Sequence, residues 1–295
     1  MSATPSLTPD RFTTLISVSE LALHVGAPDW ALIDCRHDLA DPQAGHTAYA
    51  AGHLPGAHFA SIDRDLSDQT TAADGSFRGR HPLPTQAALI ATLRAWGIDD
   101  TTQVVTYDAH GGMFAARLWW MLRWVGHAAV AVLDGGLPAW VAAGQGVSTS
   151  PEPVSRPGNI SMQSALVRTV SAADLLANLH EEKYTVIDAR SADRYRGENE
   201  TLDPVGGHIP GAKNRFFKDN LETDGCFKPA PILRTGFARL VDDPATAVMQ
   251  CGSGVTACHN LLALEVAGLP GAALYPGSWS EWCADPARPV AAGAE

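Results

Sequence analysis

The sequence predicts an α/β fold built from two similar domains, each a mainly parallel sheet flanked by helices. Three observations lead to this prediction: the length, the alternation of elements, and an internal repeat. The 295 residues suffice for two domains of ordinary size. Short apolar runs alternate with helical patterns in each half, as in sheets whose parallel strands are joined by helices.

The first part of each half carries three matched features in the same order. A Val-Ser pair before apolar positions predicts a helix with serine as its N-cap, at Ser19 and again at Ser171. An apolar run that ends in aspartate and arginine then predicts a short buried strand. A His-x-Pro-Gly-Ala segment follows. The strand-like runs are residues 31–36 and 185–190, and the His-x-Pro-Gly-Ala segments are 53–57 and 208–212.

Two more matched features complete the repeat. Residues 103–108 and 247–251 each predict a buried strand that enters a glycine-containing loop and then a helix, and residues 133–140 resemble 275–282. The distance between the copies shortens by about a dozen residues after the third feature, which places an insertion in the first copy before residue 104.

The segment 144–158 is rich in Gly, Ser and Pro and predicts an interdomain linker. We therefore expect an N-terminal domain over residues 1–150 and a C-terminal domain over residues 165–295.

Composition limits the classes of function. The formal net charge is −11 and no Lys/Arg-rich run occurs, which argues against a nucleic-acid partner. No apolar run approaches the roughly 20 residues of a membrane helix, and residues 1–14 lack the pattern of a secretory leader. The five cysteines form no Cys-x-x-Cys pair, which argues against a zinc site or a disulfide framework. We expect a cytoplasmic protein with no membrane partner.

Cys251 is the strongest candidate for a catalytic residue. A predicted strand ends at Gln250, and a helix is expected to begin near Val255 or Thr256. The glycines at 252 and 254 permit the positive φ angles that turn successive N–H groups inward. The helix N-terminus adds partial positive charge. Such a loop stabilises a thiolate and makes it a nucleophile.

The first copy of the repeat carries Asp108 where the second carries Cys251. Two glycines follow Asp108, at 111 and 112, so the loop is kept in outline while the thiol is missing. Taken alone, Cys251 could equally be a buried structural cysteine before a tight turn. The asymmetry between the copies favours one working site and one inactive copy.

With these motifs, the chain resembles the tandem-domain sulfurtransferases of the rhodanese and 3-mercaptopyruvate sulfurtransferase family, from about residue 17 to residue 283. The resemblance rests on the loop at 251–257 (CGSGVTA), the two His-x-Pro-Gly-Ala segments and Trp119-Trp120. It implies a catalytically inactive N-terminal domain and a catalytic C-terminal domain. The loop is similar to the mercaptopyruvate type, since thiosulfate-preferring rhodaneses usually carry basic residues where Gly252 and Ser253 stand.

The chemistry implied by this resemblance is a double displacement. The Cys251 thiolate takes sulfur from a small anionic donor and holds it as a persulfide, which a thiol, cyanide or thioredoxin-like acceptor then discharges. Backbone N–H groups of the loop would stabilise the charged persulfide. No metal or organic cofactor is required. The loop residues expected to bind substrate are Gly252, Gly254, Val255 and Thr256.

The resemblance also implies roles for residues outside the loop. Ser253 would form a relay with Asp63 and His81, although a turn serine, a loop carboxylate and a solvated histidine are the plain alternatives. Met113 and Phe114 match an apolar wall that faces the cysteine across the domain cleft, and ordinary core packing explains them equally well.

The donor is predicted from charge. Arg194 matches the family's substrate arginine, which would bind a carboxylate or sulfonate, whereas Arg190 and Arg196 are predicted to be structural. Mercaptopyruvate enzymes typically carry a second arginine in a Pro-Glu-Pro-Arg motif, and the aligned residue here is Asp203. The uncharged loop favours mercaptopyruvate and the missing arginine favours thiosulfate. We predict 3-mercaptopyruvate, with thiosulfate as the alternative.

Two other classes of protein share features of this loop. Cysteine-dependent phosphatases and arsenate reductases need an arginine six residues after the cysteine, and Ala257 stands there. A non-catalytic rhodanese-like protein that binds or relays a persulfide would share the fold and Cys251, but the intact loop together with Arg194 favours catalysis. Cys258 is expected to be packed rather than redox-active.

Overall fold

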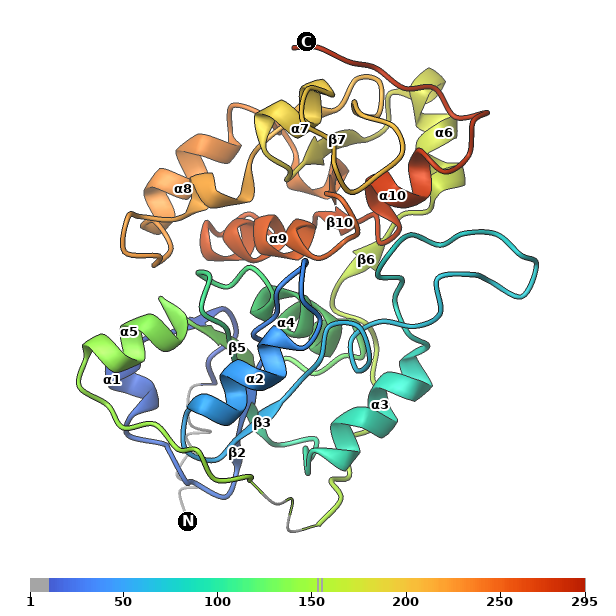
Figure 1. The fold of residues 1–295 in the computed structure, drawn as a ribbon. Helices are drawn as coiled ribbons and strands as arrows, with labels where there is room; N and C mark the ends of the chain where they lie inside the picture. The colour runs from blue at the N-terminus through green and yellow to red at the C-terminus, as the bar shows by residue number, and fades with distance from the viewer. Residues whose placement is uncertain (1–10, 153, 155, 295) are drawn as a thin grey trace, which may run out of the picture.

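The computed structural model describes residues 11–152, 154 and 156–294, and its two halves share one sheet topology (Figure 1). Each half contains a five-stranded sheet in which all pairings between neighbouring strands are parallel. The strand order is β1-β5-β4-β2-β3 in the first half and β6-β10-β9-β7-β8 in the second. The predicted α/β fold with two similar domains is confirmed.

The described elements of the first half are the strands β1 (Leu15–Ile16), β2 (Trp30–Asp34), β3 (Ala57–Phe59), β4 (Gln103–Tyr107) and β5 (Val130–Leu133), and the helices α1 (Val18–Leu21), α2 (Ala44–Ala51), α3 (Gln86–Ala95), α4 (Ala115–Trp124) and α5 (Gly136–Ala142). Those of the second half are the strands β6 (Arg168–Thr169), β7 (Thr185–Asp188), β8 (Lys213–Asn214), β9 (Ala247–Gln250) and β10 (Ala273–Leu274), the helices α6 (Ala172–Glu181), α7 (Ala192–Arg196), α8 (Ala230–Phe237), α9 (Thr256–Val266) and α10 (Ser278–Trp282), and the short 3-10 helices η1 (Phe217–Asn220) and η2 (Pro244–Thr246). The domain limits at residues 150 and 165 stay predictions.

The repeat predicts the strands well and one helix cap wrongly. Ser171 caps α6 as expected, but the cap of α1 is Ser17 and not Ser19. The Ser17 hydroxyl accepts from the Glu20 N–H while the Glu20 carboxylate accepts from the Ser17 N–H. This reciprocal pair satisfies two backbone donors, which a cap at Ser19 would leave without partners.

One hydrophobic core continues across the boundary between the halves. Helix α4 packs on α9 in the space between the two sheets (Figure 1). Residues 115–122 of α4 and 257–264 of α9 are all buried, so neither helix presents a wide polar face. Side chains of both helices belong to a single apolar cluster that also includes strand residues of both sheets. The two glycine-containing loops that precede these helices are therefore held at the interface.

The insertion in the first copy carries residues into the second domain. Equivalent hairpins close at the bridges Thr71–Phe77 and Leu221–Phe227. Eight residues, 78–85, then lead to α3, whereas two residues lead to α8. The longer connection reaches α10, where the Arg80 N–H donates to Ser280 Oγ at 3.1 Å (cyan segment in Figure 1).

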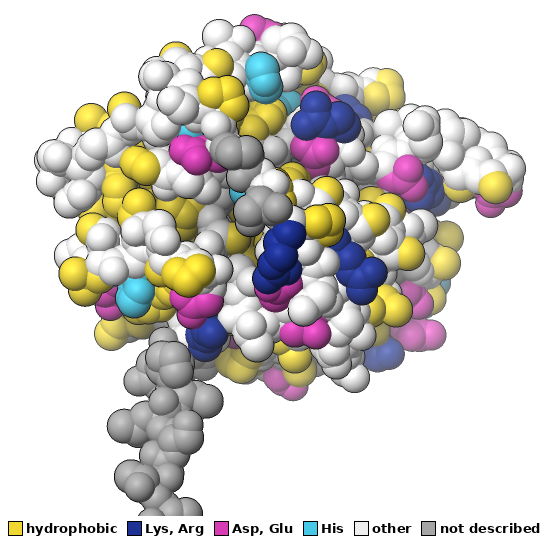
Figure 2. Space-filling view, turned by 90° about the horizontal axis from the view of Figure 1, so that it is seen from below, with side chains coloured by type: hydrophobic (Ala, Val, Ile, Leu, Met, Phe, Trp, Pro, Cys, Tyr) yellow, Lys and Arg dark blue, Asp and Glu magenta, His cyan; other side chains and the backbone are white. Residues whose placement is uncertain are grey.

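The face of the molecule shown in Figure 2 mixes Lys and Arg with Asp and Glu side chains rather than gathering one sign of charge. Within the described ranges, no helix is long and apolar enough to cross a membrane.

Candidate active site

Cys251 directly follows β9, the central strand of its sheet, at the carboxyl end where open α/β sheets bind ligands. Its side chain is buried, and the Gly254 N–H donates to its Sγ at 3.2 Å. Helix α9 begins at Thr256, as predicted. In the part of the chain that the structure describes, the N–H groups of Gly252 and Ser253 donate to no protein acceptor. The loop can therefore accept negative charge at Cys251.

The two loop glycines are needed for different reasons. Gly254 has φ +78°, and a Cβ there would lie 2.3 Å from the Pro276 carbonyl oxygen. Gly252 is outside the left-handed region, so the expectation that both glycines supply positive φ is wrong for it. A Cβ on Gly252 would instead lie 2.9 Å from Arg80 Nη2 and 3.6 Å from Arg194 Nη2. Gly252 leaves room for two guanidinium groups beside Cys251.

Ser253, His81 and Asp63 form a continuous chain of hydrogen bonds between the domains. His81 Nδ1 lies 2.7 Å from Ser253 Oγ, and His81 Nε2 lies 3.2 Å from Asp63 Oδ1. Burial, and next the nearby Arg117, lower the pKa of His81 to about 4, so the imidazole is neutral at pH 7. A carboxylate only accepts, so Nε2 carries the proton and Nδ1 accepts from the Ser253 hydroxyl.

Three arginines and three acids lie next to the cysteine loop. Arg190 pairs with Asp188 at 2.6 Å, and both side chains are almost fully buried. Arg194 donates to Glu200 from Nε at 3.0 Å and from Nη2 at 2.8 Å. The predicted structural arginine Arg196 instead pairs with the exposed Glu198, outside this group.

The third pair joins the two domains. Arg80 donates from Nη1 to Asp203 Oδ1. Burial raises the pKa of the Asp203 carboxyl, and the hydrogen bond from Arg80 acts in the opposite direction.

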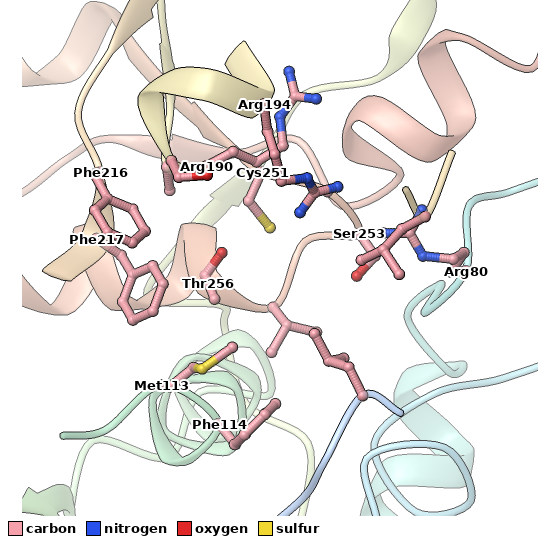
Figure 3. Close-up of a pocket in the computed structure, with 16 residues that line it drawn as sticks. Arg80, Met113, Phe114, Arg190, Arg194, Phe216, Phe217, Cys251, Ser253 and Thr256 are labelled. Atoms are coloured by element: carbon pink, nitrogen blue, oxygen red, sulfur yellow. The ribbon is translucent and has the colours of Figure 1, made fainter. Parts of the chain in front are cut away.

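These groups surround a cavity of about 130 Å³ that opens on Cys251. The Cys251 sulfur points into it, with Arg190 and Arg194 on one side and Met113 and Phe114 opposite (Figure 3). The cavity is smaller than the roughly 300–1,000 Å³ of typical ligand pockets, which suits a ligand of a few atoms. The residues that line it are Leu39, Arg80, Met113, Phe114, Ala189, Arg190, Ser191, Arg194, Leu202, Phe216, Phe217, Cys251, Gly252, Ser253, Val255 and Thr256.

The sister loop in the first domain contains its own anion. The Asp108 carboxylate accepts backbone N–H groups at 2.7–3.0 Å from the loop and from the start of α4. Asp108 Oδ1 takes those of His110 and Gly112, and Oδ2 takes those of Phe114 and Ala115. The N–H groups of this loop thus still point inward, but the Asp108 side chain accepts them in place of an external anion.

Arg117 lies behind the cysteine loop and is fully buried. Its Nη1 donates to the Gly254 carbonyl oxygen at 3.0 Å, and its Nη2 donates to the His81 carbonyl oxygen at 3.0 Å. No carboxylate among the described residues lies within ion-pair distance of it. This one side chain links the loop of Cys251 to the segment that carries His81.

Four residues at or beside the pocket were not predicted from the sequence: Arg80, Arg117, Phe216 and Phe217. Arg80 had a usable signal, because it precedes His81 in the inserted segment. Helix α4 is apolar apart from Arg117 and Arg123, and Arg117 stands among consecutive buried residues, where a charged side chain is unusual. The two phenylalanines follow a short strand and have no distinguishing pattern.

The other cysteines do not enter the pocket. Cys258 is fully buried, its Sγ lies 3.4 Å from the Gly254 carbonyl oxygen, and burial raises its pKa to about 12. All five cysteines are free. Among the described residues, no cluster of His, Cys, Asp and Glu side chains could hold a metal ion.

Comparison with known proteins gives a consistent family. The model of the rhodanese-like domain matches twice, over residues 17–143 and 171–285. The chain is 47% identical to a probable 3-mercaptopyruvate sulfurtransferase of Pseudomonas aeruginosa, over 95% of this chain and 98% of the relative. It is 33% identical to the thiosulfate sulfurtransferase of Bos taurus, over 92% of each.

Solved structures show the same architecture. The crystal structure of SseA from Escherichia coli, described as a 3-mercaptopyruvate sulfotransferase, matches with a TM-score of 0.79 and 30% identity, over 91% of this chain and 100% of that one. The 3-mercaptopyruvate sulfurtransferase from Leishmania major matches with a TM-score of 0.82 and 31% identity, over 92% of this chain and 74% of that one.

Proposed function

This chain belongs to the rhodanese family and is a sulfurtransferase, and from that premise we propose that it transfers sulfur from 3-mercaptopyruvate to a thiol or cyanide acceptor through a persulfide on Cys251. The observation that carries the proposal is the position of Cys251. Its buried sulfur accepts the Gly254 N–H and faces a small cavity lined by arginines. A sulfur anion in this loop has hydrogen-bond donors, nearby positive charge and little access to water.

The first half-reaction transfers the donor sulfur. The Cys251 thiolate attacks that sulfur, an S–S bond forms, and the donor C–S bond breaks with its electron pair passing to the carbon side as pyruvate enolate. Ser253 and His81 support this step, because Nδ1 of the neutral imidazole can take a thiol proton through the Ser253 hydroxyl while Asp63 stabilises the imidazolium. The same chain returns the proton to the enolate. In the second half-reaction an acceptor thiolate or cyanide removes the outer sulfur.

The binding roles follow from the same geometry. Arg194 and Arg80 hold the carboxylate of the donor, since each has a terminal nitrogen beside Gly252. Met113 and Phe114 form the apolar wall opposite the arginines. The N–H groups of Gly252, Gly254, Val255 and Thr256 stabilise the persulfide. We also propose a cytoplasmic location, since free thiols suit a reducing compartment.

Thiosulfate is the second candidate donor. The thiosulfate sulfurtransferase among the relatives supports it. Uncharged Gly252 and Ser253, together with the relay from Ser253 to Asp63, support mercaptopyruvate more strongly. Sulfite leaves thiosulfate without needing a proton, so a proton relay would have no use there.

The test compares both donors with cyanide as acceptor, for the wild type, Cys251→Ser and the control Cys226→Ser. We expect wild-type and control turnover to be higher with mercaptopyruvate, and Cys251→Ser to be inactive with both donors. Mass spectrometry after donor addition should show one extra sulfur atom on the peptide that contains Cys251. Full activity of Cys251→Ser would contradict the proposal. Faster wild-type turnover with thiosulfate would make thiosulfate the preferred donor in place of mercaptopyruvate.

A further inference from the structure

Asp203 lies at the edge of the donor pocket, between two of its arginines. Its side chain is only 3% exposed. Oδ1 accepts from Arg80 Nη1, and Oδ2 lies 3.6 Å from Arg194 Nη2. Oδ2 is buried and accepts no hydrogen bond from any described residue. One oxygen of Asp203 is therefore hydrogen-bonded to Arg80, and the other is attracted to Arg194 by charge alone.

The two arginines converge on the same point beside Cys251. Arg194 uses Nε and Nη2 on Glu200, and Arg80 uses Nη1 on Asp203. Their other terminal nitrogens, Arg80 Nη2 and Arg194 Nη1, lie 2.9 and 3.8 Å from the place where a Cβ on Gly252 would be. Within the described ranges these two nitrogens donate to no protein acceptor. An anionic group of the donor fits between them.

The formal charges of the cluster cancel. The cluster contains three arginines and three acids. An entering anion therefore meets strong hydrogen-bond donors but no net positive charge. The acids Asp188 and Glu200 are fully engaged by arginines and backbone N–H groups. Asp203 differs from both, because its Oδ2 accepts no hydrogen bond from any described residue while its Oδ1 accepts from an arginine that also faces the donor. The cluster consists of Arg80, Arg190, Arg194, Asp188, Glu200 and Asp203.

We propose that Asp203 is a specificity-determining residue that disfavours donors with two negative charges and thereby selects a carboxylate donor with one. The inference rests on the proposed function, because it concerns the same donor site. Thiosulfate and mercaptopyruvate would both accept hydrogen bonds from Arg80 and Arg194. The Asp203 carboxylate repels the doubly charged thiosulfate twice as strongly as the singly charged mercaptopyruvate, because Coulomb energy scales with the charge of the donor.

The first test is steady-state kinetics of Asp203→Asn with both donors. Removing the charge should lower KM about threefold for mercaptopyruvate and about tenfold for thiosulfate, because doubling the interaction energy squares the fold-change. We expect kcat to change little. The matched control is Glu198→Gln, which removes an acid of the same segment that pairs with Arg196 at the surface.

A second test measures anion binding without turnover. Sulfate, with two negative charges, and pyruvate, with one, should both protect Cys251 from iodoacetamide, and Asp203→Asn should improve protection by sulfate more than protection by pyruvate. Asp203→Ser should give the same order, which guards against a new contact made by the asparagine amide. If neither donor were turned over by the wild type, the proposed function would fail while this assay still measured the selectivity. Equal gains for the two anions, or weaker binding of both, would overturn the role of Asp203.

Discussion

The Nδ1 atom of His81 lies 2.7 Å from the Oγ atom of Ser253, although the two residues belong to different domains and are 172 positions apart in the chain. The contact exists because the inserted segment 78–85 leaves the first domain and lies against α10 of the second. The first half of the chain thus supplies a side chain that contacts the loop of Cys251.

Breaking the relay should slow mercaptopyruvate turnover. Ser253→Ala and His81→Asn are each expected to lower kcat about 100-fold, a typical contribution of a positioned proton-transfer group. The double variant should be little worse than either single variant, because the two side chains act as one unit. Stopped-flow measurement of pyruvate release checks this, and thiosulfate turnover in the same variants is the internal control. Additive losses would mean that the two residues act independently.

Replacing Arg117 should reduce turnover more than it reduces stability. Arg117→Met removes the hydrogen bonds to the carbonyl oxygens of Gly254 and His81, so the loop and the relay lose their shared support. We expect a roughly tenfold fall in kcat with either donor, since small misplacements of reacting groups are costly. The variant also removes a buried guanidinium charge that has no carboxylate partner among the described residues. This gain in stability offsets part of the loss caused by the missing hydrogen bonds.

The control for Arg117 is Arg123→Met on the same helix. Arg123 pairs with Glu265 at 3.4 Å and packs over Trp119, away from the pocket. Wild-type turnover in Arg117→Met, or an equal loss in Arg123→Met, would contradict a specific role for Arg117.

Stability should fall in acid because of buried histidines. Burial lowers the pKa of His259 to about 4, and its Nε2 lies 2.9 Å from the Gly111 carbonyl oxygen of the other domain. The unfolded chain takes up the proton near pH 6.5 and the folded chain does not, so stability is complete above that pH and is lost as the pH falls towards 4.

Between pH 7 and pH 5 this loss amounts to about 2 kcal/mol for His259 alone. His259→Gln should shrink the difference in unfolding free energy between these two pH values by that amount, as measured by urea titration. A pH dependence identical to that of the wild type would show that His259 does not contribute.

Asp108 should matter for stability and not for turnover. Asp108→Ala removes the acceptor of four backbone N–H groups, and unsatisfied buried donors cost about 1–3 kcal/mol each. Asp108→Asn retains one oxygen and should be intermediate. Thermal unfolding would rank the three proteins, and cyanide-dependent turnover per folded molecule should stay within about twofold of the wild type. A large loss of turnover at full stability would mean that the sister loop takes part in the chemistry.

The sequence predicted the elements of each domain because their signals are local. The apolar run that ends at Asp188 and the loop after Gln250 can be recognised within a few residues. The cap of α1 was predicted at Ser19, because the Val-Ser pair occurs in both copies of the repeat. The true cap is Ser17, although its partner Glu20 lies only three residues away.

The site was harder to predict because its geometry depends on the interface between the domains. His81 and Asp63 came from family resemblance, and no spacing rule would place them beside Ser253. Arg80 was missed because its role depends on Asp203 and on the absence of a side chain at Gly252. Those three residues meet only after both domains have folded against each other.

The Asp108 carboxylate is part of the chain, so the loop of the first domain always contains its anion. Under the mechanism proposed above, the loop at Cys251 would hold an outer sulfur atom only in the loaded state. That sulfur would meet the N–H groups of Gly252 and Ser253, which donate to no acceptor among the described residues, only in the folded chain. An interaction that exists only in the native state shifts the unfolding equilibrium towards that state. The second domain would therefore be harder to unfold when loaded with sulfur than when empty, whereas the stability of the first domain would stay the same in both states.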